Sequence, residues 1–384
     1  MKLNPYDPRQ PTEPEFFIGR EEYLKKFNRN LERTLYGKKP TSFAILGEWG
    51  VGKSSLLLKL KDDLDKNENI ITTRISVGSD IQNYYAFCQL LVDKINIDLT
   101  RNRRISQKIR DKIFEWKFKE VKLGVVTAQK KEKTMYLSTG NMLLEYNLKT
   151  LFDDFISKDN VKLFVLFIDD LHNITRKDKN AIAALRDLFQ SLAVDGYKIQ
   201  LVFTASSDLF HDVKQIAEPA VRFFEKFYLD AFSMDETKEF LTKPMEKTKF
   251  GITFANESMH YLHKRTNGHP YFLAFITQRL VDLMDSGEIN VDVIEKYWEL
   301  IFKELIEEKF ERDVSGVSPE KEKLLVSIAN REDDMVVPKD VGGLRKYYPE
   351  LTHDNLLKKV GRGKYRLYHP LFKEYLKTKN LEEK

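Results

Sequence analysis

The stretch FAILGEWGVGKSS, residues 43–55, decides the fold of this 384-residue chain. It has the pattern of a short apolar strand, a glycine-rich turn and the start of an amphipathic helix. Gly47, Gly52, Lys53 and Ser54 satisfy G-x-x-x-x-G-K-[ST], in which glycines let backbone N–H groups turn inward around an anion. The helix that follows adds the positive end of its dipole. These residues therefore predict a phosphate-binding loop.

Two side chains of this loop have the chemistry that a nucleoside triphosphate requires. Lys53 is long enough to reach the β- and γ-phosphates, and the Ser54 hydroxyl is placed to complete the shell of a phosphate-bound Mg²⁺. The loop residues expected to bind the nucleotide are Gly47, Glu48, Trp49, Gly50, Val51, Gly52, Lys53, Ser54 and Ser55.

A second decisive stretch is VKLFVLFIDDLHN, residues 161–173. The apolar run 163–168 has the pattern of a strand buried on both faces of a parallel sheet, and ligands bind beyond the carboxyl ends of such strands. Asp169 would then lie beside the phosphate loop and hold Mg²⁺, usually through water. Asp170 points elsewhere and is the candidate for orienting or deprotonating the attacking water.

Further candidates follow in KIQLVFTASSDLF, residues 198–210, and PAVRFFEKF, residues 219–227. Ser207 or Thr204, at the end of the first stretch, would sense the γ-phosphate or hold the water; capping of the turn is the alternative. Arg222 would act as an arginine finger, within the chain or towards a neighbour, or else as a surface or structural arginine.

Two other segments are candidates for contacts with the nucleotide base. Phe17 and Ile18 precede a helix and would flank an adenine ring, or equally would form a hydrophobic staple for that helix. In TNGHPYF, residues 266–272, Gly268 ends one helix and Pro270 starts the next. This places a rigid kink where a lid would fold over the base.

Composition narrows the class of protein. Lys+Arg of 64 against Asp+Glu of 59 leaves a net charge of only +5, so any case for nucleic acid rests on local patches. The most basic patch is RNRRISQKIRDKIFEWKFKEVK, residues 101–122, which would meet phosphate backbone or an acidic partner, or would be a solvated helix face. The single cysteine, Cys88, and the lack of a signal peptide or an 18-residue apolar run predict a soluble cytoplasmic protein without membrane contact.

The pattern predicts four parts of the chain. Residues 1–15 form an extended proline-rich strap, and residues 16–228 form an α/β core with a basic insertion near 101–140 that includes a hairpin-like VKLGVVTAQ and TMYLSTG. Residues 229–312 form a helical lid. Residues 313–384, with three short helices and the hairpin GRGKYRLYHP, form a winged-helix domain.

The third of these helices is expected in LTHDNLLKKV, residues 351–360. The recognition helix and wing would then share a positive face suited to phosphates, and a packing or autoinhibitory module is the equal alternative. The residues of this face are Lys358, Lys359, Arg362, Lys364 and Arg366.

In their order, FIGREEYL, GEWGVGKSS, LFIDD, TASSDL, AFSMDETKEF and GHPYFL resemble the archaeal ATPase family. This branch of the P-loop NTPases is similar both to AAA+ initiators of the origin-recognition type and to STAND signalling ATPases. The resemblance implies a parallel sheet of order 5-1-4-3-2 flanked by helices, then a helical lid and a winged helix. It also implies ATP and Mg²⁺ as cofactors.

Two departures from the AAA+ pattern bear on function. Asp170 stands where a glutamate is usual, which favours slow turnover, and Tyr271 stands where initiator lids place a sensor arginine. Gly268 and Pro270 resemble the STAND lid instead. We therefore expect a slow, Mg²⁺-dependent ATP-hydrolysing switch that controls a protein partner and forms a nucleotide-dependent oligomer. The alternatives are a DNA-binding initiator or transposition-type ATPase whose winged helix contacts duplex DNA and, less favoured, an inert nucleotide-binding scaffold.

Overall fold

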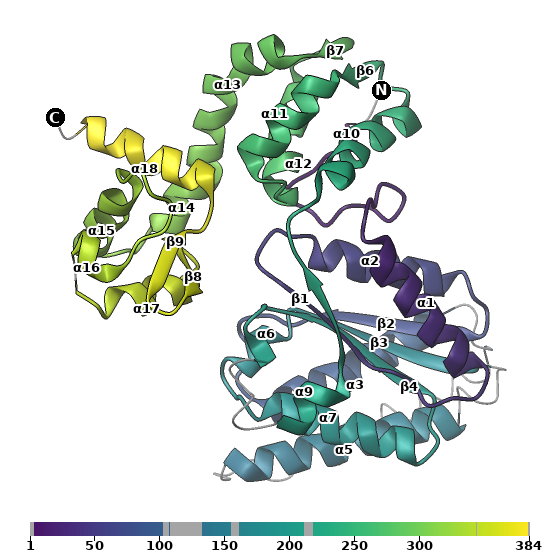
Figure 1. Cartoon of the computed structure of the whole chain (residues 1–384). Helices are drawn as coiled ribbons and strands as arrows, with labels where there is room; N and C mark the ends of the chain where they lie inside the picture. The colour runs from purple at the N-terminus through teal and green to yellow at the C-terminus, as the bar shows by residue number, and fades with distance from the viewer. Residues whose placement is uncertain are drawn as a thin grey trace. The chain divides into compact units, whose positions relative to one another are not determined.

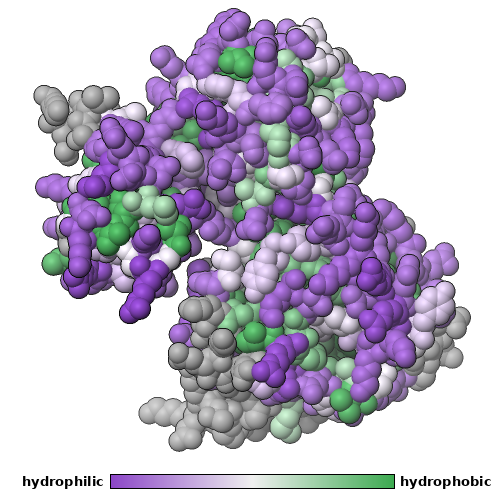
Figure 2. All heavy atoms as spheres, in the orientation of Figure 1, coloured by the Kyte–Doolittle hydropathy of each residue, from purple (hydrophilic) through white to green (hydrophobic). Residues whose placement is uncertain are grey.

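The computed structural model describes residues 4–102, 107, 133–154, 161–210, 218–342 and 344–382. The chain divides into two compact units, one of residues 11–230 and one of residues 1–10 with 231–384, and Figure 1 shows the elements of both. In the face drawn in Figure 2, hydrophilic side chains cover most of both units. No helix in the described ranges is long and apolar enough to cross a bilayer.

The first unit contains a five-stranded sheet of order β2-β3-β4-β1-β5 in which every neighbouring pair is parallel. Its strands are β1 (Phe43–Gly47), β2 (Ile70–Ser76), β3 (Leu163–Asp169), β4 (Ile199–Ala205) and β5 (Glu225–Leu229). All residues of β1, β3 and β4 are buried, as central strands covered on both faces must be. The α/β class and the strand order expected from the resemblance are confirmed.

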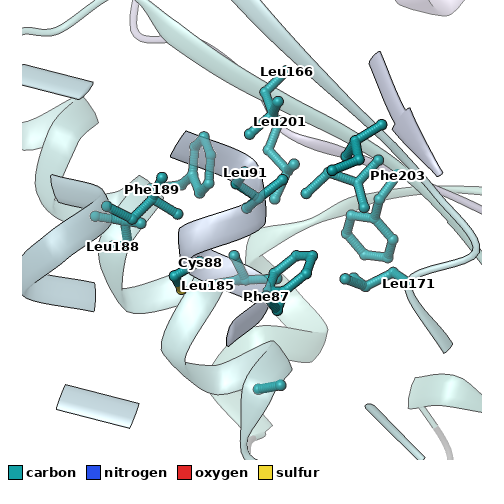
Figure 3. Close-up of a cluster of buried hydrophobic side chains, with 14 of the residues drawn as sticks. Phe87, Cys88, Leu91, Leu166, Leu171, Leu185, Leu188, Phe189, Leu201 and Phe203 are labelled. Atoms are coloured by element: carbon teal, nitrogen blue, oxygen red, sulfur yellow. The ribbon is translucent and has the colours of Figure 1, made fainter. Parts of the chain in front are cut away.

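Helices cover both faces of this sheet (Figure 1). On one face, α1 (Glu21–Leu35) and α2 (Lys53–Asp65) pack on Phe43, Ile45 and Phe167. On the other, the larger cluster in Figure 3 joins the sheet to the helices that follow β2, β3 and β4. These helices are α3 (Tyr84–Arg101), α5 (Lys133–Asp154), α6 (His172–Thr175), α7 (Ala181–Val194) and α9 (Glu218–Phe223).

The hairpin-like insertion predicted at residues 134–140, TMYLSTG, is wrong, because these residues belong to helix α5. The cause is packing on α3, which overrides the weak helix preference of threonine and glycine. A Cβ at Gly140 would lie 3.0 Å from Tyr84 and 3.2 Å from the Cys88 sulfur, so the glycine permits close approach of the two helices. VKLGVVTAQ and almost all of the basic stretch 101–122 lie outside the described residues.

The second unit is mostly helical. It begins with α10 (Met234–Thr248), α11 (Asn256–Thr266), α12 (Pro270–Asp282) and α13 (Val291–Leu305), which continues through the π-helix η2 (Ile306–Phe310) into α14 (Glu311–Val314); β6 (Ile252–Phe254) and β7 (Gly287–Ile289) form a small parallel pair. Then come α15 (Pro319–Ala329), α16 (Pro338–Val341), α17 (Tyr347–His353), the antiparallel hairpin β8 (Leu357–Gly361) and β9 (Lys364–Leu367), and α18 (Pro370–Glu382).

The third short helix predicted at residues 351–360 is also wrong beyond His353, where α17 ends. Asn355 adopts a left-handed conformation with φ 60°, which stops the helix, and the chain then enters β8. Lys358 and Lys359 therefore lie on a strand of the hairpin rather than on a recognition helix.

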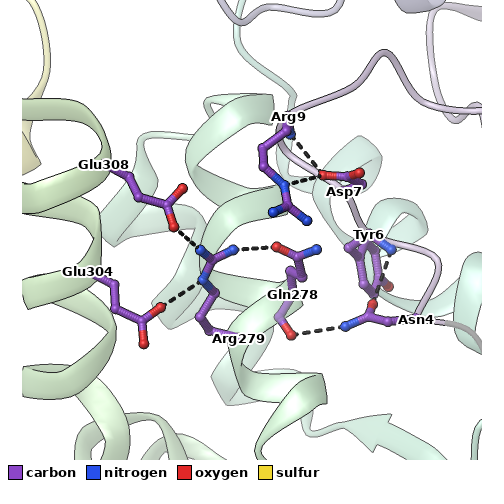
Figure 4. Close-up of polar contacts among 8 residues, drawn as sticks. All are labelled: Asn4, Tyr6, Asp7, Arg9, Gln278, Arg279, Glu304 and Glu308. Carbon is purple, nitrogen blue, oxygen red and sulfur yellow. Dashed lines mark hydrogen bonds and ion pairs between the residues drawn. The ribbon is translucent and has the colours of Figure 1, made fainter. Parts of the chain in front are cut away.

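The N-terminal residues 4–10 pack on this second unit, as Figure 4 shows. The Tyr6 side chain is 3% exposed, and its hydroxyl lies 3.0 Å from the carbonyl oxygens of both Phe240 and Leu241 in α10. Pro244 stands inside α10 and has no N–H for the Phe240 carbonyl four residues earlier. The Tyr6 hydroxyl therefore supplies the donor that the proline removes.

Candidate nucleotide-binding site

The phosphate loop connects the end of β1 at Gly47 to the start of α2 at Lys53. Gly50 and Gly52 have φ of 75° and 93°, a region that favours glycine. A Cβ at Gly47 would lie 2.8 Å from the Leu229 carbonyl oxygen and 2.8 Å from Val51 Cγ2. The shape of the loop therefore depends on glycine at all three positions.

The N-terminus of α2 is suited to an anion. Its N-cap, Gly52, has no side chain to cap the first N–H groups, and the first turn contains no acidic residue. Lys53 Nζ lies 2.7 Å from the Glu48 carbonyl oxygen, so its ammonium stays beside the loop. Burial lowers the pKa of Lys53, an effect that nearby carboxylates, foremost Asp170, oppose. A phosphate beside this ammonium would further favour its charged form.

Asp169, the last residue of β3, lies next to the loop and is 2% exposed. Its Oδ1 accepts hydrogen bonds from Ser54 Oγ at 3.0 Å and from Thr204 Oγ1 at 2.6 Å. Its Oδ2 forms an ion pair with the Arg74 guanidinium at 2.7 Å. The fold thus brings Ser54 and Asp169 together, as the parallel-sheet interpretation predicts.

Asp170 turns away from Asp169 because its backbone is left-handed, with φ 59°. Its N–H donates to Thr204 Oγ1 at 2.8 Å, while its side chain remains 39% exposed. Burial and the charge of Asp169 raise the pKa of Asp170, against the opposing charges of Lys53 and Arg74. A carboxylate with a raised pKa and access to solvent is suited to hold a water molecule and accept its proton.

His172 lies beside this carboxylate, with Nδ1 3.9 Å from Asp170 Oδ1. Burial, together with the charges of Arg176 and Lys53, lowers the pKa of His172 to about 4. The imidazole is therefore neutral near pH 7. His172 follows Asp170 by two residues, and the short helix α6 that begins at His172 keeps the two side chains close.

The other residues predicted from the sequence are more dispersed. Thr204 joins the site through the hydrogen bonds above, whereas Ser207 is exposed in the turn after β4. Arg222 precedes β5, whose first residue, Glu225, pairs with Phe43 at the start of β1. Arg222 therefore lies at the edge of the sheet opposite the phosphate loop, in a hollow of about 530 Å³ that Lys39 and Arg186 also line. This placement separates Arg222 from the phosphate loop of its own chain, so a role towards a neighbour or as a surface or structural arginine stays a prediction.

The segment before α1 also reaches the loop. Phe17 packs against the core that includes Val51, and the Arg20 guanidinium donates to the carbonyl oxygens of Val51 and Asp230. Ile18 is half-buried in the same segment. Gly268, with φ 65°, and Pro270, the first residue of α12, belong to the second unit, so their place at the base stays a prediction.

Sequence reasoning missed Arg74 and Arg20. A signal for Arg74 is present in IITTRISV, residues 70–77, where it is the only charged residue of a strand. A charged side chain in such a strand needs a group of opposite charge, and a carboxylate at the carboxyl end of a neighbouring parallel strand can supply it.

The oxygen atoms available as metal ligands at this site fit Mg²⁺. Ser54 and Asp169 supply hard oxygen atoms 3.0 Å apart, next to the helix N-terminus where phosphates would lie. Among the described residues, no group of three or more His, Cys, Asp or Glu side chains is placed to hold a metal ion. Bound by Ser54 and Asp169, Mg²⁺ would take its remaining ligands from phosphates and water.

A parallel sheet of this order, with a glycine-rich phosphate loop after β1 and a carboxylate at the end of β3, defines an AAA+-like P-loop ATPase. The family described as an ATPase domain predominantly from Archaea matches residues 17–276. The chain belongs to this archaeal ATPase family. No protein with a curated description matches it.

Solved structures agree on the fold. The Walker-type ATPase PABY2304 of Pyrococcus abyssi is 16% identical, with 96% of this chain and 99% of that chain covered and a TM-score of 0.55. The ORC2 protein of Aeropyrum pernix is 13% identical, with 96% of both chains covered and a TM-score of 0.57. The ORC1 protein of the same organism, solved in complex with DNA, is 13% identical, with 96% and 94% covered and a TM-score of 0.51.

Proposed function

We propose that this ATPase is a Mg²⁺-dependent molecular switch that binds and slowly hydrolyses ATP to control a partner. The observation that supports it best is the convergence of Ser54, Thr204 and Arg74 on the buried Asp169, with Asp170 beside it. In this proposal Lys53 and the N–H groups of the loop bind the phosphates, while Ser54 and Asp169 hold the metal ion. Mg²⁺ supplies charge neutralisation at the phosphates.

Asp170 would orient the attacking water and accept its proton, with Thr204 fixing the backbone from which the carboxylate projects. One methylene shorter than glutamate, Asp170 reaches less far, which is the reason to expect slow turnover. Ser207 and, from a neighbouring copy, Arg222 remain candidates for contacts that exist only in the triphosphate state.

The switch requires the second unit to respond to the nucleotide. In the proposal, contacts made only with the γ-phosphate favour a closed arrangement in which Gly268 and Pro270 cover the base. Two features support coupling between the phosphate loop and the second unit. The chain passes between the units after residue 10 and again after residue 230. Arg20 donates to the carbonyl oxygen of Val51 in the loop and to that of Asp230, where the chain leaves the first unit. Hydrolysis would release the second unit to act on the partner.

Two variants test the proposal. Lys53→Ala should abolish ATP binding in calorimetry, because the loop loses its only ammonium. Asp170→Ala should bind ATP normally but stop steady-state phosphate release. Glu68→Gln, an exposed carboxylate between α2 and β2, is the matched control and should behave as wild type. Wild-type hydrolysis by both Lys53→Ala and Asp170→Ala would exclude these roles.

A second candidate function is duplex-DNA binding through the β8–β9 hairpin. The observation that favours it is a cluster of cations on one hairpin, in which Lys358 stands directly opposite Arg366 in the ladder. Cations grouped in this way would suit the phosphate backbone of a duplex. Lys359, Arg362 and Lys364 are exposed on the same hairpin.

A salt titration of duplex-DNA binding with ATP, with ADP and without nucleotide separates the two candidates. DNA binding should weaken steeply with salt, and charge reversal at Lys358, Lys359 and Arg362 should flatten that dependence. Lys296→Glu, on the exposed face of α13, is the control for net charge. Undetectable affinity at moderate salt in all three nucleotide states would exclude this candidate.

A further inference from the structure

Arg74 projects from β2, next to β3 in the sheet. The register pairs Arg74 with Phe167 and Ser76 with Asp169, so the guanidinium extends along the strands towards their carboxyl ends. It is 30% exposed and contacts a carboxylate that is 3% exposed, at a distance of 2.7 Å. A surface ion pair contributes little to stability. Because the Asp169 carboxylate is almost fully buried, loss of Arg74 would instead leave an uncompensated buried charge.

The two oxygen atoms of Asp169 have different partners. Oδ1 accepts from the hydroxyls of Ser54 and Thr204, whereas Oδ2 is bound by Arg74. Both oxygen atoms of the Asp169 carboxylate are thus already bound by side chains of this protein. A metal ion or its water molecules would have to share this carboxylate with a guanidinium.

Arg74 also has an unused donor. Its Nε is buried and has no hydrogen-bond partner among the described residues. The guanidinium therefore keeps an N–H for a further acceptor.

We propose, on the basis of the function above, that Arg74 is a positioning residue that compensates the buried Asp169 in the metal-free site and competes with Mg²⁺ for it. Removing one partner of a buried ion pair leaves an uncompensated charge, which is strongly unfavourable. Arg74 therefore keeps the site assembled without metal and raises the Mg²⁺ concentration needed for nucleotide binding.

The test uses the full chain and two readouts that do not depend on hydrolysis. The first is the thermal midpoint without nucleotide, in EDTA and in Mg²⁺. The second is the Mg²⁺ concentration at half-maximal binding of a fluorescent ADP analogue. Arg74→Gln should lower the midpoint in EDTA, and Mg²⁺ should recover part of that loss. The Mg²⁺ concentration required should fall about three- to tenfold, with Arg74→Lys intermediate.

Arg176→Gln is the matched control, since it removes an exposed arginine near His172 that has no ion pair with Asp169. Arg74→Gln/Asp169→Asn tests the pairing directly: in EDTA its midpoint should lie above that of Arg74→Gln, because the uncompensated charge is gone. The proposal is overturned if Arg74→Gln matches Arg176→Gln in both readouts, if it requires more Mg²⁺ than wild type, or if the double variant is no more stable.

These outcomes differ from a failure of the proposed function. If wild type shows no Mg²⁺-dependent nucleotide binding, the proposed function fails, and with it the competition. If wild type binds nucleotide with Mg²⁺ but Arg74→Gln has unchanged Mg²⁺ dependence, only the role of Arg74 fails.

Discussion

Thr204 illustrates how a single hydroxyl contacts both the candidate metal ligand Asp169 and the candidate catalytic residue Asp170. Its Oγ1 accepts the N–H of Asp170 and donates to Oδ1 of Asp169. Because a hydroxyl has one proton and two lone pairs, this arrangement uses the donor and one acceptor position. The left-handed turn at Asp170 and the orientation of the Asp169 carboxylate therefore depend on the same side chain.

Thr204→Val retains the shape of this side chain and removes its hydroxyl. Thr204 is fully buried, so the Asp170 N–H loses its partner without replacement by water. We expect a loss of about 1 to 3 kcal/mol in the free energy of unfolding, measured by urea denaturation, and slower phosphate release. Thr204→Ser should restore both quantities, and equal behaviour of Val and Ser would contradict the role of the hydroxyl.

The residues of the site differ in how far the sequence alone predicts them. The phosphate loop and Asp169 were predictable because local patterns specify them: glycines before a Lys-Ser pair, and an apolar run that ends in carboxylates. Local sequence marks Arg74 only as a charged residue in a strand; its partner, Asp169, lies 95 residues away and follows from the register of the sheet.

Among the elements, the connection between α11 and α12 packs closely against neighbouring backbone. Gly268 has φ 65°, and a Cβ there would lie 2.3 Å from the Phe232 carbonyl oxygen and 2.9 Å from the His263 ring. The Gly268 carbonyl also accepts the Phe232 N–H at 2.8 Å. The sequence correctly placed a helix end and a helix start at this connection, but not the backbone that packs against it.

Gly268→Ala should therefore destabilise the second unit by about 2 kcal/mol or more, because the clash with backbone adds to the cost of the left-handed conformation. Gly316→Ala is the control, with φ 84° but no atom within 4 Å of the added Cβ, and should cost only about 1 kcal/mol. Urea denaturation of both variants measures the difference. Equal losses would mean that close packing contributes nothing here.

In helix α10, the Tyr6 hydroxyl supplies the hydrogen-bond donor that Pro244 lacks. Tyr6→Phe removes only the hydroxyl that lies beside the Phe240 and Leu241 carbonyl oxygens. We expect a loss of about 1 kcal/mol or slightly more in unfolding free energy, since a buried carbonyl then lacks its donor. Tyr36→Phe, at a residue 90% exposed, should change nothing. A neutral Tyr6→Phe would show that water replaces the hydroxyl.

For the whole molecule, the buried His369 and the half-buried His172 make the free energy of unfolding depend on pH in the acidic range. In the second unit, His369 donates from Nε2 to the Thr266 carbonyl oxygen and accepts the Leu371 N–H at Nδ1. Burial lowers the pKa of His369 to about 3, and that of His172 in the first unit falls to about 4. Both imidazoles are neutral in the folded protein, whereas the unfolded chain binds their protons near pH 6.5.

The sign of the effect follows from proton uptake. Below about pH 6.5 the unfolded state binds more protons, so these histidines lower stability as the pH falls from 6.5 towards 3 or 4. Urea denaturation between pH 7.5 and pH 4.5 should show a decline that His369→Gln makes shallower for the second unit. An unchanged slope in the variant would contradict the assignment.

The division into a parallel-sheet unit and a helical unit was predictable in outline from apolar periodicity. The helix over residues 133–140 was not, because it depends on the close approach of α3 at Gly140. Nor was the docking of residues 4–10 on the second unit. Contacts between segments so distant in sequence leave no periodic signal in either segment.

That docking has a consequence for how the chain folds during synthesis. Asn4 binds the backbone of Gln278, and 274 residues separate the two. Residues 4–10 emerge from the ribosome before the first unit, yet their binding surface on α10 and α12 emerges only after the whole of that unit. The first unit can therefore fold before the N-terminal segment is bound. The second unit is complete only once residues 4–10 pack on α10 and α12.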